Sequence, residues 1–439
     1  MNYTMNEVLK FIKENDVKFI RLAFCDIFGT QKNISIMPDE LPRAFEYGIS
    51  FDASAISGFM NVEESDLFLV PDPVTLSVLP WRPSHGRVVR FFCNIKHQDG
   101  TPFEGDGRYT LKKVIRQAEA LGYNCKIGSE CEFYLFQMDE KGMPTTVPHD
   151  FGGYCDIAPM DKGENVRREI CLTLEEMGIK PESSHHEQGP GQNEVDFKYS
   201  DVLTAADNLV TFKSVVKTVA ARNGLHASFM PKPLPEKSGS GLHINISLFK
   251  NGLNVFNNRG KEYGQIPEEF IAGVMAKIPE MTAFLNPLPN SYTRFGKFEA
   301  PKYITWSHQN RSQLIRIPAA EDEYCRMELR SPDPSCNPYL AFALVVQAGL
   351  EGISQHMQPL PAFDANIYEA EHDKLHGLAL IPESLNSAIK LARESTFAQH
   401  VLPQKTLDKF LSSKQAEWDR YNRAENKEQF ERTSYFLNV

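Results

Sequence analysis

Residues 128–136 read GSECEFYLF, and this stretch decides the fold because it predicts a strand with two different faces. Side chains alternate along a strand, so Glu130 and Glu132 lie together on one face. Cys131 and Phe133 then lie on the other face. Two carboxylates on a buried face repel each other unless a cation joins them. Taken alone, such a pair is more typical of a solvated edge strand, so a metal site needs support from other residues.

Two further segments carry polar residues in turn or strand contexts. Glu187 and Glu194 bracket the loop HHEQGPGQNE, in which two glycines and a proline force turns. His243 lies in GSGLHINIS, where a flexible Gly-Ser-Gly leads into an alternating strand. Polar glycine-rich loops are common, and a lone strand histidine is more often a hydrogen-bonded core residue than a metal ligand.

A third segment, RMELR, alternates Arg326, Glu328 and Arg330, so the three side chains project from one face. Such a trio either faces solvent or lines an ionic site. Taken together, the three segments and the GSECEFYLF strand supply five carboxylates and one imidazole: Glu130, Glu132, Glu187, Glu194, Glu328 and His243. Oxygen-rich ligand sets suit Mg²⁺ or Mn²⁺, and one histidine is compatible with Mn²⁺.

Two divalent cations and several arginines are what phosphoryl transfer from ATP requires, because its catalysis is mostly positioning and charge neutralisation. The sequence lacks Gly-x-x-x-x-Gly-Lys-Ser/Thr, which excludes a P-loop nucleotide site. The net charge of -10 argues against a nucleic-acid partner. No apolar run of about 18 residues predicts a membrane span, and the polar N-terminus does not resemble a signal peptide. Eight scattered cysteines without a CxxC pair favour a reduced, cytoplasmic protein.

The pattern of elements predicts an α+β protein with two domains. Thr4 and Glu7 form a capping-box pair before an amphipathic helix, and several short strands follow within residues 1–100. The turn-rich segment TPFEGDG at 101–107 is a predicted linker. Residues 108–439 form the larger domain, with strands at 129–136, 194–199, 242–248 and 325–330. Predicted helices cover 110–121, 161–177, 203–223, 267–285 and 338–356, and a helical tail covers 382–422.

Over nearly its whole length the chain resembles glutamine synthetase of the bacterial type I class, in the short form without an adenylylation segment. The motifs FDASAISGF, GSECEFYLF, SSHHEQGPGQNEVDF, GSGLHINIS, NRSQLIRIP and RMELRSPDP occur in family order. The resemblance implies a β-grasp domain at 1–100 and, at 108–439, a catalytic domain whose antiparallel sheet forms a funnel surrounded by helices. It also implies a dodecamer of two hexameric rings, with active sites between subunits.

The resemblance implies roles for individual residues, and these follow the motifs. One metal would be held by Glu132, Glu187 and Glu194, and the other by Glu130, His243 and Glu328. Arg311, Arg316 and Arg326 would neutralise the transferring phosphoryl group. Arg294, Arg330 and the Gly239 loop would bind glutamate, and Glu182, Asn245 and Ser247 match positions near the ATP. Asp52, Tyr154 and Glu187 match ammonium-binding positions, and Glu299 matches a flap carboxylate that accepts a proton.

The implied reaction makes glutamine from glutamate, ammonia and ATP through γ-glutamyl phosphate. Four positions depart from the family pattern. Ala55 replaces a serine beside Asp52, and Ser238 replaces an asparagine before the Gly239 loop. The segment 294–299 is one residue short, and Asn61 replaces an arginine linked to feedback by glutamine. The changes around the amine and amino-acid pockets motivate an alternative, a γ-glutamylamide synthetase that uses methylamine or a polyamine. A non-catalytic structural or regulatory paralogue is a further alternative.

Overall fold

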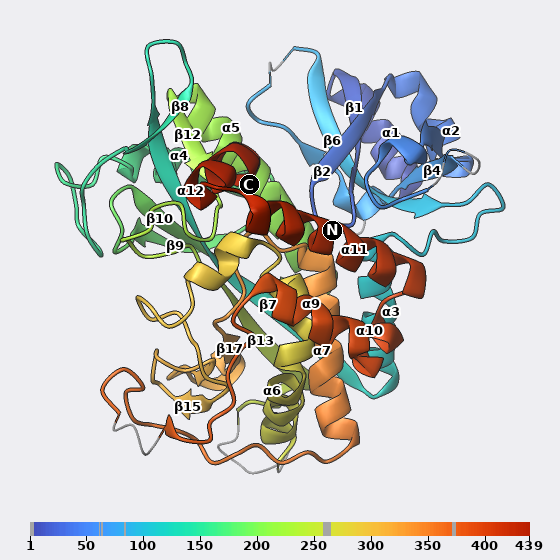
Figure 1. The fold of residues 1–439 in the computed structure, drawn as a ribbon. Helices are drawn as coiled ribbons and strands as arrows, with labels where there is room; N and C mark the ends of the chain where they lie inside the picture. The colour runs from blue at the N-terminus through green and yellow to red at the C-terminus, as the bar shows by residue number, and fades with distance from the viewer. Residues whose placement is uncertain (1–3, 61, 63–64, 83–84, 258–264, 371–374) are drawn as a thin grey trace.

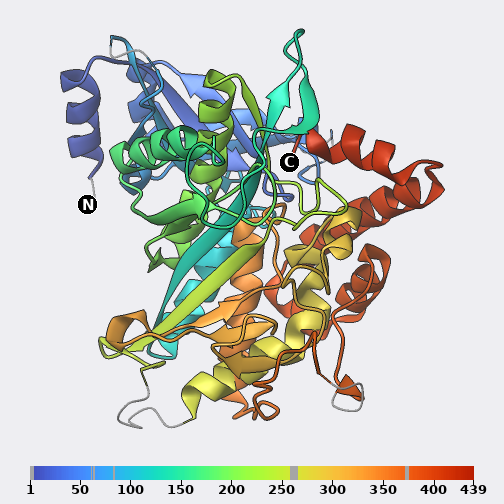
Figure 2. The same cartoon turned by 90° about the vertical axis from the view of Figure 1, so that its left-hand side faces the viewer.

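The computed structural model describes residues 4–439 apart from 61, 63–64, 83–84, 258–264 and 371–374. Asn61, with its predicted loss of feedback, therefore lies outside the described residues. The described chain forms two sheets, a smaller one near the N-terminus and a larger one crossing the rest of the molecule (Figure 1). Helices of the C-terminal half lie along one side of the larger sheet, as the turned view also shows (Figure 2).

The N-terminal sheet has the order β2-β1-β6-β4-β3, with β5 added to β6. Strands β1 and β6 are parallel neighbours, and the other pairs are antiparallel. Its elements are α1 (Met5–Glu14), β1 (Val17–Cys25), β2 (Gln31–Ile36), α2 (Leu41–Glu46), β3 (Ile49–Asp52), β4 (Asp66–Pro71), β5 (Ser77–Val78) and β6 (Arg87–Lys96). The predicted capping box is present, because the Thr4 side chain accepts from the backbone of Glu7 and Glu7 binds the backbone of Thr4.

The larger sheet is built around the long strand β7, which pairs with β13 on one side and β10 on the other. Its main order is β15-β16-β17-β13-β7-β10-β9. The strands are β7 (Tyr123–Met138), β8 (Pro144–Pro148), β9 (Pro181–His186), β10 (Gln192–Phe197), β11 (Ser200–Asp201), β12 (Leu225–Ser228), β13 (Leu242–Lys250), β14 (Leu253–Asn254), β15 (Trp306–His308), β16 (Ile315–Ile317) and β17 (Met327–Leu329). All its pairs are antiparallel except β15 with β16, which confirms the predicted mixture of helices with an antiparallel sheet.

Helix α7 is the buried centre of the helical layer, since nearly all of its residues from Pro338 to Ile353 are shielded from solvent. It packs against α3, α5 and α6. The helices are α3 (Gly107–Ala120), α4 (Glu164–Glu176), α5 (Val202–Arg222), α6 (Ile266–Leu285), α7 (Pro338–Ser354), α9 (Leu385–Glu394), α10 (Thr396–Val401), α11 (Gln404–Arg423) and α12 (Lys427–Glu431). The predicted helical tail is thus divided into three helices. Within the described residues, no helix combines the length and apolarity that a membrane crossing needs.

The segment between the two sheets is packed. Phe103 is 5% exposed, and its ring lies 5.1 Å from that of Phe59 in an edge-on arrangement. Asp106 caps α3 by accepting from the backbone of Arg108, and it also accepts from the backbone of Ile95 in β6. The two sheets therefore share one hydrophobic core at this joint.

Candidate active site

Polar and charged side chains line a cavity of about 730 Å³ on the larger sheet. It contains most of the residues that the sequence singles out: Glu130, Glu132, Tyr154, Glu187, Glu194, Gly239, His243, Arg294, Glu299, Arg311, Arg316, Arg326 and Arg330. Glu328 is fully buried beside it, bonded to Arg316 and Arg330. The six predicted metal ligands therefore converge in space.

Strand register brings these carboxylates together. Glu130 of β7 lies directly opposite His243 of β13 on one side and Asp196 of β10 on the other. Glu132 lies directly opposite Glu194. Because paired residues on neighbouring strands share a face, β7 and β10 deliver their acidic side chains, and β13 delivers His243, to the same side of the sheet.

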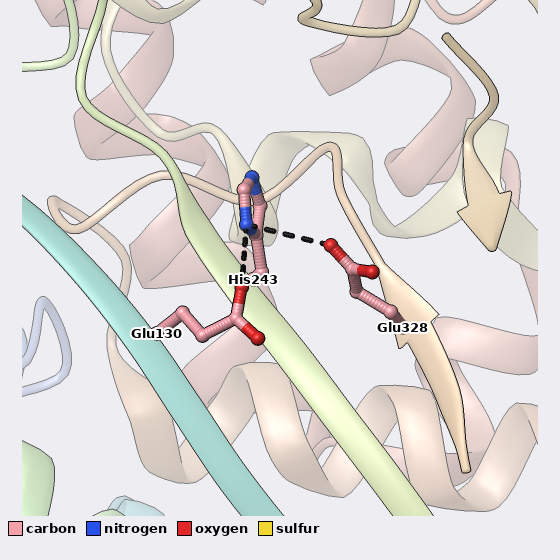
Figure 3. Close-up of side chains that lie close together, drawn as sticks. All are labelled: Glu130, His243 and Glu328. Atoms are coloured by element: carbon pink, nitrogen blue, oxygen red, sulfur yellow. Dashed lines mark hydrogen bonds and ion pairs between the residues drawn. The ribbon is translucent and has the colours of Figure 1, made fainter. Parts of the chain in front are cut away.

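One half of the cluster centres on His243 (Figure 3). Its Nδ1 lies 3.0 Å from Oε2 of Glu130 and 3.5 Å from Oε1 of Glu328. The Asn245 amide donates to Glu130 over 2.9 Å. Burial opposes ionisation of Glu130, but the bonds to His243 and Asn245 outweigh it and lower its pKa to about 2. Nη1 of Arg316 donates to Glu328 over 2.6 Å, which keeps that buried carboxylate charged.

The other half of the cluster carries unbalanced negative charge. The backbone of Gly241 and the side-chain amide of Gln192 each donate to Oε2 of Glu132 over 2.9 Å. Burial, together with the charges of Glu132 and Asp196, raises the pKa of Glu194 well above its usual value. Closely spaced acids of this kind bind a proton or a cation, so the site fits a bound divalent cation.

His185 and Asp196 belong to this half of the cluster, and the sequence analysis missed both. His185 Nε2 lies 3.0 Å from Oε1 of Glu187 and 3.9 Å from Glu194. One ligand atom from each of His185, Glu194 and Asp196 lies within 4.8 Å of the others. The spacing of two between His185 and Glu187, and between Glu194 and Asp196, repeats the period of the GSECEFYLF strand and was the available signal.

The arginines of the cavity differ in exposure. Arg294 is buried and donates to the carbonyls of Ser331 and Arg330. Arg326 donates from Nε to the Asn245 side chain over 2.9 Å. Arg311 is exposed at the cavity wall, with no fixed partner among the described residues. An exposed arginine beside hydrogen-bonded, more buried ones suits an anionic substrate that enters from solvent.

Glu299 reaches the cavity from an unusual backbone. It has φ +65°, and Phe298 before it has φ +49°, so two successive residues that are not glycine occupy the left-handed region. Such a conformation costs free energy, on the order of 1–3 kcal/mol at each residue, and is typical of functional loops. The loop thereby places the Glu299 carboxylate among the lining residues, near Arg330.

Besides Glu328, four predicted residues are not among the described residues that line the cavity. Asp52 is exposed at the end of β3 in the N-terminal sheet, where it accepts from the backbone and hydroxyl of Ser54. Glu182 is exposed on β9. Asn245 and Ser247 are buried on β13, and the Ser247 hydroxyl donates to the backbone of Cys325.

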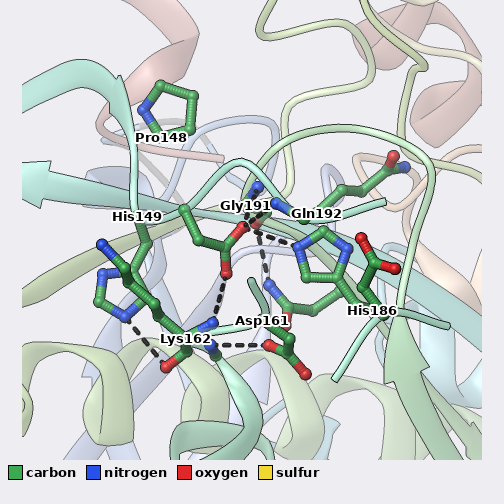
Figure 4. Close-up of polar contacts among 12 residues, drawn as sticks. Pro148, His149, Asp161, Lys162, His186, Gly191 and Gln192 are labelled. Atoms are coloured by element: carbon green, nitrogen blue, oxygen red, sulfur yellow. Dashed lines mark hydrogen bonds and ion pairs between the residues drawn. The ribbon is translucent and has the colours of Figure 1, made fainter. Parts of the chain in front are cut away.

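A buried polar network holds the loops around the cavity (Figure 4). Asp150 Oδ1 lies 2.7 Å from Nε2 of His186 and accepts from the backbone of Gly191, while its Oδ2 accepts from the backbone of Lys162. Nδ1 of His186 lies 2.7 Å from the carbonyl of Glu187. Despite burial, the bond to His186 lowers the pKa of Asp150 to about 2. The network therefore fixes the loop that presents the Glu187 carboxylate.

Replacing Asp150 with Asn is expected to lower kcat between about 10- and 100-fold. Removing a residue that orients a metal ligand typically lowers activity by that factor. The variant should also need more Mn²⁺ for half-maximal rate. Circular dichroism checks that it folds. Asp139→Asn is the matched control, since Asp139 likewise accepts backbone bonds, from Lys141 and Met143, but in an exposed turn. Equal metal requirements in the two variants would contradict this positioning role.

Comparisons with known proteins agree with this geometry. The family model described as "Glutamine synthetase, catalytic domain" matches residues 104–433, and "Glutamine synthetase, beta-Grasp domain" matches 16–98. A glutamine synthetase of Clostridium saccharobutylicum is 48% identical over 95% of this chain and 96% of its own. One of Methanosarcina mazei is 47% identical over 95% of both chains.

Solved structures agree as well. A structure titled "GmaS/ADP complex-Conformation 1" has a TM-score of 0.88 at 30% identity, covering 98% of this chain and 99% of its own. A cryo-EM structure of Plasmodium falciparum glutamine synthetase has a TM-score of 0.86 at 26% identity over 99% of both chains. Fold and site thus define a ligase with a β-grasp domain and a catalytic domain. The chain belongs to the glutamine synthetase family, as its sequence motifs predict.

Proposed function

We propose that the chain joins ammonia to the side-chain carboxylate of glutamate, driven by ATP, and so acts as a glutamate–ammonia ligase. The observation that carries this proposal is the cavity in which buried carboxylates and arginines converge. Glutamate and ATP are both anions, and the chain as a whole carries a charge of -10. A local surplus of cations, from arginines and bound metal, is what lets such substrates enter.

The carboxylates and the imidazole suit two divalent cations, Mg²⁺ or Mn²⁺. Glu132, Glu187 and Glu194 would hold one, and Glu130, His243 and Glu328 the other. When bound, the ions neutralise phosphate oxygens and so lower the barrier to phosphoryl transfer. Arg311, Arg316 and Arg326 are proposed to stabilise the remaining charge on the γ-phosphate.

The other candidate residues, some of which line the cavity and some of which do not, are assigned to the substrates. Arg294, Arg330 and the Gly239 loop are proposed to bind glutamate, and Glu182, Asn245 and Ser247 to lie near the nucleotide. In the first step an oxygen of the glutamate side chain bonds to the γ-phosphorus as the bond to ADP breaks. In the second, the ammonia nitrogen bonds to the acyl carbon and phosphate leaves. Asp52, Tyr154 and Glu187 would bind ammonium, and Glu299 would accept its proton.

Two features favour an organic amine as the alternative nucleophile. Ala55, three residues after Asp52, offers no hydroxyl where the family pattern has a serine. Ser238 is buried and donates a hydrogen bond to Gln192, which in turn donates to Glu132. This position, where the family has asparagine, is therefore connected to the carboxylate cluster of the active site. A changed pocket of this kind could favour methylamine or a polyamine over ammonia.

A panel of amines separates these activities. The protein is incubated with ATP, glutamate, Mg²⁺ or Mn²⁺ and either ammonium, methylamine or putrescine, and products are identified by mass. We expect glutamine from ammonium, formed at least about tenfold faster than either amide. Omission of ATP is the control. Product from an organic amine alone would establish the alternative, and absence of phosphate release with every amine would indicate the non-catalytic paralogue.

Assembly follows the same proposal. Asp52 lies on the N-terminal sheet and does not line the cavity of its own chain among the described residues. We therefore propose that a neighbouring subunit supplies it, in a homo-oligomer that is a dodecamer of two hexameric rings.

The domain boundary is placed between residues 100 and 108. A cytoplasmic location is proposed because seven cysteines in the described part of the chain are free thiols: Cys25, Cys93, Cys125, Cys131, Cys155, Cys171 and Cys336.

A further inference from the structure

A second cavity, of about 540 Å³, lies between the N-terminal sheet and helix α5. Arg21 of β1 and Arg90 of β6 reach it from the sheet, and Lys217 and Arg222 reach it from α5. Arg82 lies in the loop between β5 and β6. None of the described residues that line it is acidic, although the whole chain carries a charge of -10.

These cations are poorly compensated by the protein. Arg222 pairs with Glu169 over 3.3 Å at the exposed rim. Within the described part of the chain, Arg21, Arg82 and Arg90 have no carboxylate within ion-pair distance. Burial and the positive charge of Arg82 lower the pKa of Arg21, as expected when like charges face each other.

Arg90 contributes a buried positive charge to the wall of the cavity, and its guanidinium carbon lies 4.0 Å from the centroid of the Phe92 ring. It is 7% exposed, and its Nη1 donates to the Thr211 hydroxyl over 2.6 Å. Its Nε is buried and has no hydrogen-bond partner among the described residues. The negative charge of Asp207 favours the charged form of Arg90. The Asp207 carboxylate, however, already accepts hydrogen bonds from Arg108 and Tyr339. Among the residues that the structure describes, no carboxylate pairs directly with the Arg90 charge, and an anion in the adjoining cavity would help to balance it.

Several of the remaining lining residues also carry hydrogen-bonding side chains, although the Ser214 hydroxyl already donates to Gln31 over 2.6 Å. Gln31 and Asn33 of β2 lie on the sheet side, and Ser214 and Thr218 lie on α5. Hydroxyls and side-chain amides among several cations make up the donor set that binds phosphate or carboxylate oxygens. The cavity is separate from the active-site cavity, since the two have no lining residue in common.

We propose that this cavity binds a small anion with at least two negative charges, either a phosphate compound or a polycarboxylate. The anion joins Arg21, Arg82 and Arg90 of the N-terminal domain to Lys217 of α5. A ligand that bridges the sheet and the helix binds the folded chain better than the unfolded one, so it stabilises their packing.

The test uses pyrophosphate and citrate as separate probes, titrated calorimetrically at low salt after metal ions have been removed on a chelating resin, so that no metal ion recruits the probes to the active site. We expect at least one probe to bind and to raise Tm. The double variant Arg21→Gln/Arg82→Gln should weaken that binding at least about tenfold, because two charge-assisted contacts are lost. The control Lys10→Gln/Arg43→Gln removes the same charge from exposed positions outside the cavity. It should change the affinity for the probe less than about twofold.

The choice of probe identifies the ligand chemistry, since binding of pyrophosphate alone indicates a phosphate compound and binding of citrate alone a polycarboxylate. Should the double variant fail to fold, Arg222→Gln at the exposed rim replaces it, with an expected weakening of about threefold. The proposal is overturned if neither probe binds. It is also overturned if binding survives loss of Arg21 and Arg82 but disappears in Arg311→Gln, which would place the anion in the active site.

Discussion

Replacing Glu130 with Gln is expected to lower kcat for glutamine formation on the order of a thousandfold. Glutamine keeps the shape of the side chain and removes its charge. Glu130 lies opposite His243 in the sheet, 3.0 Å from its Nδ1, and is proposed to hold the same cation as His243 and Glu328. The measurement is phosphate release and glutamine formation at saturating ATP, glutamate and ammonium, over a range of Mn²⁺ concentrations.

The same variant should lose most of the increase in Tm that Mn²⁺ gives the unaltered protein, because a binding ion stabilises only a chain that can hold it. Glu140→Gln is the matched control, since Glu140 is an exposed acid just beyond the end of the same strand. If Glu130→Gln stays within about tenfold of normal activity at every Mn²⁺ concentration, Glu130 is not a metal ligand.

The sequence predicts the strands of the site because their period of two is visible locally. Glu130 and Glu132 share a face as the pattern requires, and Cys131 and Phe133 are fully buried on the other. The bounds of β7 were less predictable. The strand runs from Tyr123 to Met138, well beyond the predicted 129–136. Its ends pair with β8, β11 and β12, and the last two lie so far along the chain that they leave no local pattern.

At RMELR the strand is shorter than predicted, whereas β7 is longer than predicted. The predicted strand 325–330 is reduced to Met327–Leu329, since β13 offers only three paired positions and β16 only two. Arg326 and Arg330 nevertheless line the cavity with the register that the alternation predicts. Alternation therefore predicts the face of a side chain better than it predicts where hydrogen bonding stops.

The site itself depends on contacts that a single sequence does not display. Asp150 and His186 meet across 36 positions, and their bond is visible only after the loops are folded. The sequence analysis also took the segment 101–107 as a linker on account of its turn formers, although Phe103 in its middle is core. Composition identifies a turn, but burial of one aromatic residue decides whether that turn is free or packed.

Replacing Arg108 with Met is expected to lower the free energy of unfolding by about 3–5 kcal/mol, since it leaves buried carboxylates without their partner. Arg108 is 3% exposed, and its guanidinium donates to both oxygens of Asp207. Nη2 also lies 2.9 Å from Asp72 in the N-terminal domain, and Nη1 donates to Asn94 of β6. Methionine fills similar volume, so the change isolates the lost charge and hydrogen bonds from a cavity effect.

Urea denaturation, followed by circular dichroism and by tryptophan fluorescence, measures the change. Arg116→Met is the matched control on the same helix, because Arg116 is exposed and its described contact is a distant one, 5.9 Å from the Tyr109 ring. We expect that control to stay within about 0.5 kcal/mol of the unaltered chain. The position of Arg108 between the two sheets gives the experiment a second readout. If this residue joins the domains, the two optical signals should separate in Arg108→Met, whereas equal stability and coincident transitions in both variants would show that the joint is held by apolar packing alone.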